Sequence, residues 1–298
     1  MATASKFPPQ DPEVAVVTVS YGSESVLGAF LSSLPTASSK PLHIVVADNK
    51  PAPEDASVVA QLTESAGGRY LAMPTNEGYG HAVNAAVSTL PSSIAWVLIS
   101  NPDVVVSEHA IDQLLESAGA DQTVAAIGPR ILSSTGEVYP SARMVPSVRS
   151  GIGHAIFANL WPSNPWTRQY RKSTSLSMVR RDAGWLSGAF LLVRRSVFDD
   201  LRGFDASYFM YFEDVDLGYR IGKMGLRNVY EPAASVVHTG AHSTKSDSAR
   251  MVRAHHDSAR RFLFQKYSGF WLWPVRVVLG AGLAVRSRAE ERRASRES

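Results

Sequence analysis

Acidic side chains that follow apolar runs are the residues in this sequence best placed for chemistry. Asp103 lies in residues 96–106 (WVLISNPDVVV), where a strand-length apolar run stops at a Ser-Asn-Pro-Asp turn. Pro102 removes a backbone donor and biases Asn101 towards an extended conformation, so the turn presents Asp103 on stiff backbone. The carboxyl edge of an open sheet is where α/β proteins bind ligands. Because Asn, Pro and Asp also favour ordinary turns, this segment alone predicts either a turn or a ligand site.

A second acidic group lies in residues 208–220 (YFMYFEDVDLGYR), at the predicted start of a helix that ends near residue 225. It comprises Glu213, Asp214 and Asp216. Carboxylates near a helix N-terminus complement the helix dipole, and this is the ordinary interpretation. The aromatic residues around them would also remove water from the carboxylates, as a general base requires. Both interpretations remain open from the residues alone.

The elements that must position these residues alternate between strands and helices. The apolar pattern predicts strands at 13–21, 42–47, 70–73, 96–99 and 124–128, with helices between them at about 23–34, 54–66, 80–90 and 107–118. Such alternation implies an α/β fold with parallel pairing and right-handed crossovers. Further along, the pattern predicts a glycine-punctuated strand at 183–193, a strand at 228–238 ending in His238, and a helix at 248–267. Residues 129–180 show poor periodicity and are typical of a long loop or lid near an acceptor site.

Polar residues follow four of the predicted strands at the point where each strand ends. They are Ser20-Tyr21, Asp48-Asn49, residues 76–80 and residues 101–103. In a doubly wound sheet these ends share one edge, which favours a nucleotide-type site. The segment after the first strand, SYGSES, is neither a GxGxxG motif nor a P-loop, which argues against a dehydrogenase or a kinase.

Composition indicates a globular protein with a basic end. The 298 residues are 45% hydrophobic and 19% charged, and the absence of cysteine excludes a disulfide, a thiolate nucleophile and a cysteine zinc site. Residues 249–298 carry a net charge of +7, and the first 248 residues carry −4. The opening residues have no apolar signal-peptide core, so we expect a disordered N-terminus at 1–12 and a cytoplasmic protein. The apolar stretch at 270–285 contains Pro274 and Arg276 and is shorter than the roughly 20 residues of a spanning helix.

Taken together, the strand-end motifs resemble the inverting family 2 glycosyltransferases, and most closely their rhamnosyltransferase branch. The motifs, in order, are TVSY, ADN, NEGYGHAVN, NPDV, WLSGAFLLVRR, GFD and YFEDVDLGYR. The resemblance implies a GT-A catalytic domain at 13–245, with a Rossmann-like, mostly parallel sheet flanked by helices. It divides this domain into a nucleotide-binding half at 13–128 and an acceptor-binding half at 129–245. A basic, partly apolar helical region at 246–298 would associate with a membrane.

The resemblance also implies the residues that bind the donor. Asp48 would contact the nucleotide base, and the neighbouring donor-site residues would be Thr18, Ser20, Tyr21, Asn76, Gly78 and Asn84. Asn101 and Asp103 match the DxD pair of the family, in which the second acid binds a Mg²⁺ or Mn²⁺ ion that bridges the donor diphosphate. Here Asn101 is neutral; it can hydrogen-bond the ribose but adds no charge to the metal site.

The resemblance also implies which residues bind the acceptor and remove its proton. Asp214 matches the catalytic base of the family, and Trp185 matches the aromatic residue that forms the acceptor wall. Glu213 and Asp216 would be neighbours of Asp214 and would bind either acceptor hydroxyls or Arg220. His238 follows Asp214 by 24 residues, as a metal-binding histidine does in related galactofuranosyl enzymes. Four arginines are candidates for phosphate contacts, and the sequence does not choose among them: Arg130, Arg143, Arg180 and Arg181.

The implied donor is dTDP-L-rhamnose, and the implied acceptor is polyprenyl-diphosphate-linked N-acetylglucosamine, used to build the linker between peptidoglycan and arabinogalactan. A lipid-linked acceptor and a basic tail predict a peripheral protein on the inner face of the plasma membrane. The tail has a plainer interpretation, in which it packs on its own domain or on a second copy of the chain. Nothing predicts a nucleic-acid partner.

Three alternatives stay open. The chain could use another nucleotide-sugar within the same family, or be a catalytically silent nucleotide-sugar-binding protein on the same scaffold. A nucleotidyltransferase acting on sugar phosphates would show a glycine-rich and basic loop after the first strand, which this chain lacks. The combination of Asp103, Asp214 and His238 favours the enzyme over the silent binder.

Overall fold

The computed structural model describes residues 14–51, 57–119, 121–147, 178–240, 248–274 and 276–277. The predicted disordered N-terminus at 1–12 lies outside the described residues. So do residues 148–177 of the predicted loop at 129–180, and the end of the basic region from residue 278.

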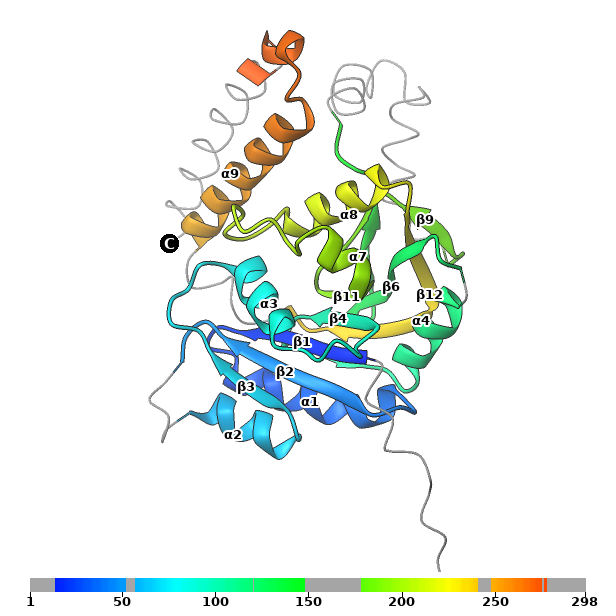
Figure 1. Cartoon of the computed structure of the whole chain (residues 1–298). Helices are drawn as coiled ribbons and strands as arrows, with labels where there is room; N and C mark the ends of the chain where they lie inside the picture. The colour runs from blue at the N-terminus through cyan, green and yellow to red at the C-terminus, as the bar shows by residue number, and fades with distance from the viewer. Residues whose placement is uncertain are drawn as a thin grey trace, which may run out of the picture.

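A ten-stranded sheet runs through the middle of the molecule (Figure 1). In spatial order its main strands are β3 (Arg69–Ala72), β2 (Leu42–Asp48), β1 (Val14–Ser20), β4 (Trp96–Ser100), β11 (Phe190–Arg194), β6 (Val124–Ser133), β12 (Arg227–His238) and β5 (Val104–Val106). β7 (Val138–Tyr139) pairs with β6, and β9 (Arg181–Ala183) pairs with β12. β1, β2, β3 and β4 are mutually parallel, as are β6 and β12, whereas β11 and β5 run antiparallel to their neighbours. The expected mostly parallel α/β sheet is confirmed.

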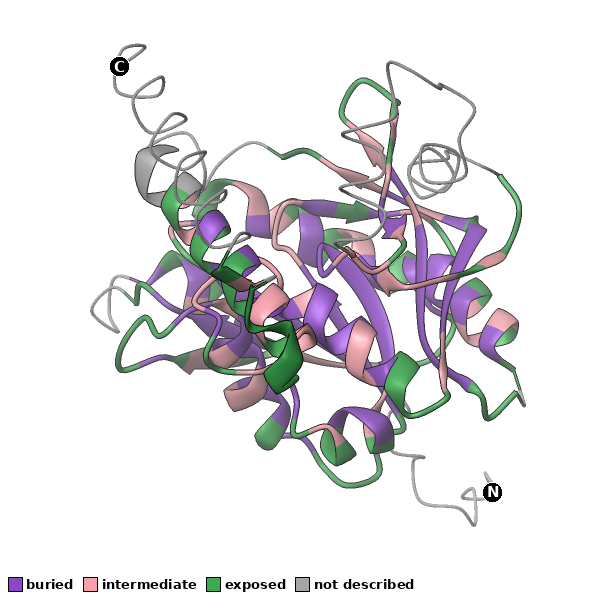
Figure 2. Cartoon of the chain, turned by 90° about the horizontal axis from the view of Figure 1, so that it is seen from above, coloured by how far each residue is buried: buried purple, intermediate pink, exposed green. Residues whose placement is uncertain are grey.

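Helices cover both faces of the sheet. One face carries α1 (Glu24–Ala37), α2 (Val58–Ser65) and α4 (Ala110–Ala118), and the other carries α3 (Tyr79–Ser88), α7 (Arg195–Asp200) and α8 (Glu213–Lys223). β1 is buried along its whole length because a parallel strand under helices on both sides has no solvent face. Figure 2 shows this burial as a continuous central band of strands, with the exposed residues on the outer helices and loops.

The predicted strand at 183–193 is wrong in one respect, because this range contains the last residue of β9 and two further strands. β10 (Trp185–Leu186) pairs with β8 (Ala142–Arg143) in a separate two-stranded sheet, and β11 then enters the main sheet between β4 and β6. An apolar run predicts a strand but carries no information on its direction. Because β11 is antiparallel, its start lies at the edge of the sheet where β1, β2 and β4 end. The residues just before β11 therefore lie at this same edge.

The basic helix expected at 248–267 is present as α9 (Ser248–Lys266), followed by the 3₁₀ turn η2 (Phe270–Leu272). α9 packs on α8 through Phe262, whose ring lies 5.8 Å from Phe212 and 5.7 Å from Tyr219 between ring centres. Within the described residues, no helix combines the length and the apolar character needed to cross a bilayer.

Candidate active site

The ends of β1 and β2 place the predicted base-contacting residues side by side. Ser20 is paired in register with Asp48, and Thr18 lies two residues earlier on β1; both hydroxyl residues are fully buried. Asp48 Oδ1 accepts a hydrogen bond from the backbone N–H of Lys50 at 3.1 Å, and Oδ2 accepts one from the Tyr70 hydroxyl at 3.2 Å. Burial raises the pKa of Asp48. A carboxylate held by neighbours in this way keeps lone pairs available for a ligand N–H.

Tyr21 lies at the outer rim of this edge. Its side chain is 45% exposed, and the Lys50 ammonium lies 5.8 Å from the centre of its ring. An exposed aromatic ring beside a buried carboxylate is suited to stack on a flat ligand.

The loop before α3 is locked to the turn before α8. Gly78 has a φ of 108°, and a Cβ at this position would collide with the carbonyl oxygen of Phe209. The next residue, Tyr79, donates its backbone N–H to the same oxygen at 3.0 Å. Asn76 Oδ1 accepts the Gly78 N–H at 3.1 Å, and the Asn49 side chain donates to the Gly78 carbonyl at 3.3 Å. Only glycine permits this close approach of two backbone segments.

Two predicted site residues, Asn84 and Asp216, form hydrogen bonds that hold neighbouring segments together. Both amide atoms of Asn84 bond the backbone of Phe204, Oδ1 to its N–H at 2.9 Å and Nδ2 to its carbonyl at 2.8 Å. Asn84 thus ties α3 to the backbone of Phe204, and its contact with the nucleotide stays a prediction. Asp216 accepts a hydrogen bond from Arg220 Nε at 2.6 Å, and Arg220 also donates to the Leu201 carbonyl. Of the two roles expected for Asp216, the structure shows the pairing with Arg220.

Asp103 and His238 meet at the end of β4, although 135 positions separate them in the sequence. His238 is the last residue of β12 and pairs in register with Val104 of β5. Its Nε2 lies 3.0 Å from Asp103 Oδ1 and 3.3 Å from the side-chain nitrogen of Asn101. Thr239 donates its backbone N–H to the Asp103 carbonyl at 3.0 Å. This bond holds the end of β12 against the start of β5. The structure thus gathers the three residues predicted for the metal and the ribose.

The start of α8 holds two adjacent buried carboxyl groups in different environments. Asp214 Oδ2 accepts the backbone N–H of Gly188 at 2.9 Å, and Oδ1 accepts that of Val215 at 2.8 Å. Glu213 is 8% exposed, and its buried Oε2 has no hydrogen-bond partner among the described residues. Burial and the neighbouring Asp214 raise the pKa of Glu213 to about 8, and burial also raises the pKa of Asp214. Because hydrogen bonds stabilise the charged form, the pair places its negative charge on Asp214 and its proton on Glu213.

Tyr79 is a site residue that the sequence analysis did not select. Its hydroxyl donates to the carbonyl of Gly188 at 3.3 Å, and the backbone N–H of Gly188 donates to Asp214, so this one residue joins Tyr79 to Asp214. Burial, followed by the charges of Glu213, Asp214 and Asp103, raises the pKa of Tyr79, which keeps the hydroxyl protonated. Its position directly after Gly78 in the NEGYGHAVN motif was the available signal.

Trp185 forms a wall beside α8. Its backbone and Cβ lie so close to Gly218 that any side chain there would collide with them, and its indole Nε1 donates to the Met144 carbonyl at 3.2 Å. The guanidinium of Arg143 lies 5.9 Å from the Trp185 ring and acts to lower the pKa of Asp214.

Of the four candidate arginines, Arg143 is the one that the structure brings to the carboxylates. Arg180 bonds Ser117 and pairs with Glu231, and Arg181 stacks on Tyr230. Arg130 donates to the sulfur of Met178 at 3.5 Å. Arg143 is therefore the arginine best placed to meet a charged substrate group.

This fold and site define a class of protein. One edge of a Rossmann-like sheet carries three groups. They are the buried Asp48 at the end of β2, the pair of Asp103 and His238 at the end of β4, and Asp214 on α8, whose pKa is raised by burial. That arrangement suits an enzyme that transfers a group from a nucleotide-linked donor.

Comparison with known proteins then identifies the family. Residues 9–256 match the family described as "Glycosyltransferase like family 2", and the chain belongs to this family of enzymes. It is 42% identical over 95% of its length to the N-acetylglucosaminyl-diphospho-decaprenol L-rhamnosyltransferase of Mycobacterium tuberculosis, covering 94% of that protein. It is 26% identical to the rhamnosyltransferase WbbL of Escherichia coli, over 85% of this chain and 93% of that one. The resemblance to family 2 glycosyltransferases is therefore confirmed.

Solved structures support the same fold. A mannosyltransferase from Pyrobaculum calidifontis, in complex with GDP-Man and Mn²⁺, superposes with a TM-score of 0.57 at 16% identity, over 96% of this chain and 76% of that one. GalNAc-T7 with UDP, GalNAc and Mn²⁺ gives a TM-score of 0.56 at 16% identity, over 76% of this chain and 44% of that one. The expected GT-A fold is confirmed.

Proposed function

We propose that this chain transfers L-rhamnose from dTDP-L-rhamnose to N-acetylglucosaminyl-diphospho-polyprenol, with inversion, to form the linker between peptidoglycan and arabinogalactan. The observation that carries the proposal is the 42% identity, over nearly the whole of both chains, to the mycobacterial rhamnosyltransferase. A single buried base at the transfer site is consistent with one direct displacement, which inverts the sugar carbon.

On the donor side, we assign recognition of the base to Asp48. A thymine ring carries one ring N–H, and a buried carboxylate with free lone pairs is a suitable acceptor for it. Tyr21 would stack on the base, and the amide of Asn101 would bond the ribose. Thr18, Ser20, Asn76 and Gly78 would shape the same pocket, as part of the nucleotide-binding half at 13–128.

On the acceptor side, Asp214 would remove the proton from the attacking hydroxyl, and a base placed in this way contributes about 10² to 10⁴ in rate. Trp185 would pack on the apolar face of the acceptor sugar, and Glu213 would hold an acceptor hydroxyl close to the base. These residues belong to the acceptor-binding half at 129–245. Gly188 bonds Asp214 through its backbone N–H and Tyr79 through its carbonyl, and so links this side to the helix that follows Gly78.

We propose that Asp103 and His238 hold a Mg²⁺ or Mn²⁺ ion. The Asp103 carboxylate oxygen and the His238 imidazole nitrogen lie 3.0 Å apart, and both are atom types that bind divalent metal ions. Magnesium is commonly bound by one or two protein groups together with substrate phosphates. When bound, the ion would neutralise the charge that develops on the departing diphosphate.

We further propose that the C-terminal region docks on the inner face of the plasma membrane, where a polyprenyl-linked acceptor is found. Three aromatic side chains in and directly after η2 are strongly exposed: Phe270 by 75%, Trp271 by 87% and Trp273 by 56%. Aromatic side chains suit the membrane interface, and each basic residue near an anionic surface adds about 1 kcal/mol.

Flotation with vesicles that contain anionic lipid tests this docking. Replacing Phe270, Trp271 and Trp273 together by Ala is expected to lower the bound fraction at least about ten-fold, because the variant loses most of the apolar surface it can bury. The control variant Val58→Ala/Met224→Ala removes exposed apolar side chains elsewhere, 47% and 44% exposed, and should bind like the unchanged chain. Equal flotation of the triple variant would contradict the docking.

The transfer reaction itself is tested with dTDP-L-rhamnose and with UDP-sugars on a polyprenyl-diphosphate N-acetylglucosamine acceptor. A rhamnosylated product from dTDP-L-rhamnose is the expected result. Transfer from a UDP-sugar alone would keep the enzyme class and overturn the donor. Tight nucleotide binding without any transfer would favour the silent binding protein.

A further inference from the structure

The turn that leads into Glu213 and Asp214 has an unfavourable backbone. Tyr211 and Phe212 have φ angles of 67° and 66°, in the left-handed region. Bulky residues rarely adopt this conformation, so the surrounding structure must hold these two in place. Phe212 immediately precedes α8, and its conformation sets the position from which Glu213 and Asp214 extend.

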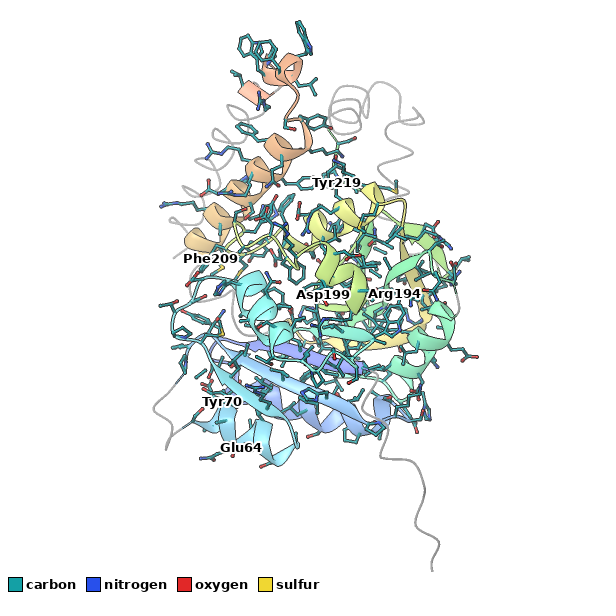
Figure 3. The ribbon with its side chains drawn as sticks, in the orientation of Figure 1. Glu64, Tyr70, Arg194, Asp199, Phe209 and Tyr219 are labelled. Atoms are coloured by element: carbon teal, nitrogen blue, oxygen red, sulfur yellow. The ribbon has the colours of Figure 1, made fainter. Side chains whose placement is uncertain are left out.

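One side of this turn is held by α3. The Phe209 carbonyl accepts the backbone N–H of Tyr79, and Gly78 allows the two backbone segments to touch. Figure 3 labels Phe209, which lies beside the first turns of both α3 and α9. The turn is therefore enclosed between these two helices.

The other side is held by α9. The His255 ring meets the rings of Tyr211 and Phe212 edge-on, with centres 5.5 Å and 5.4 Å apart. Ser258 Oγ donates to the Met210 carbonyl at 2.8 Å, one residue before the left-handed pair. His255 thus contacts both left-handed residues at once.

We propose that His255 is a positioning residue for Asp214. Its ring keeps Tyr211 and Phe212 in the left-handed conformation, and it thereby holds the start of α8 where Asp214 receives the Gly188 N–H. This inference rests on the proposed function, in which Asp214 is the base. It makes α9, the helix that leads to the exposed aromatic residues, a structural part of the active site.

The test compares two replacements of His255 in the full-length chain. His255→Ala removes the ring and is expected to lower kcat about ten-fold or more while the KM for dTDP-L-rhamnose stays within about two-fold, because a base displaced by about 1 Å loses rate and not donor affinity. His255→Phe keeps an aromatic edge and should restore most of kcat. Asp257→Ala, exposed on the same helix, is the matched control and should leave kcat unchanged. An unchanged kcat in His255→Ala, or an equal loss in His255→Phe, would overturn the proposal.

Hydrogen exchange gives a second readout that needs no substrate. Backbone amides in residues 208–214 should exchange faster in His255→Ala than in the unchanged chain, and at the unchanged rate in His255→Phe and Asp257→Ala. Equal exchange in all four proteins would overturn the inference. If the unchanged chain transfers no rhamnose, the proposed function fails, and the exchange rates still decide this inference. Should His255→Ala not fold, Ser258→Ala, which removes the bond to Met210, is expected to give the same exchange result.

Discussion

Replacing Asp214 by Asn is expected to lower the kcat of sugar transfer by a factor of about 10² to 10⁴, which leaves almost no activity. Asparagine keeps the shape of the side chain and can still accept a backbone N–H, but it cannot take a proton from the acceptor hydroxyl. Binding of dTDP should stay nearly unchanged because the nucleotide residues lie at the ends of β1 and β2. Single-turnover transfer and dTDP titration measure the two effects separately, and substantial residual turnover would refute the role of base.

Asp216→Asn is the matched control, two positions along the same helix. Asp216 bonds Arg220, so its replacement is expected to lower thermal stability while the chemical step survives.

The pH dependence of kcat gives an independent check on Asp214. Since burial raises the pKa of this carboxyl, kcat should rise with pH over a range above that of an ordinary aspartate. Glu213, with a pKa of about 8, keeps its proton over much of this rise. A kcat for the chemical step that changes with pH only in the range of an ordinary aspartate would contradict the assignment.

Removal of the metal, or of Asp103, is the second change expected to have a large effect. Asp103→Ala and treatment with EDTA should each lower kcat by about 10² or more, because a Lewis acid contributes several kcal/mol to the stabilisation of the leaving group. Added Mg²⁺ or Mn²⁺ should restore the EDTA-treated enzyme in full. Since Asn101 adds no charge to the site, we expect the ion to be removed readily.

The behaviour of His238→Ala distinguishes a metal site from a simple hydrogen-bonded pair. Excess metal should rescue His238→Ala in part, since Asp103 remains, and should not rescue Asp103→Ala. Asp121→Asn, which alters a surface aspartate paired with Arg227, serves as the control and should retain full activity. Activity that is insensitive both to EDTA and to Asp103→Ala would contradict the metal proposal.

The donor edge was predictable because alternating strands and helices force the strand ends together. Ser20 and Asp48 were expected to be neighbours on this argument, and the register pairs them directly. The same reasoning placed Asp103 at the end of a strand. The contact between Asp103 and His238 required the resemblance as well, since β12 reaches that edge only through a pairing that no local pattern encodes.

The features that the sequence did not predict share a physical cause. Both amide atoms of Asn84 bond the backbone of Phe204, 120 residues away, and such a pairing leaves no local signal. The direction of β11 was equally hidden, because its four buried apolar residues read the same in a parallel and an antiparallel strand. Tyr79 was missed because a tyrosine at the start of a helix resembles an ordinary core residue.

During synthesis, β4 and β6 leave the ribosome well before β11, the strand that separates them in the finished sheet. Until β11 arrives, both strands carry an unpaired edge, and apolar side chains such as Ile99 and Ile127 lack their partners, which favours pairing with the wrong strand. The insertion joins Ser100 to Ala189, 89 residues further on, and contacts over such distances slow folding. Asp214 and His238 are made later still. A nascent chain therefore lacks part of the proposed catalytic site until His238 has been synthesised.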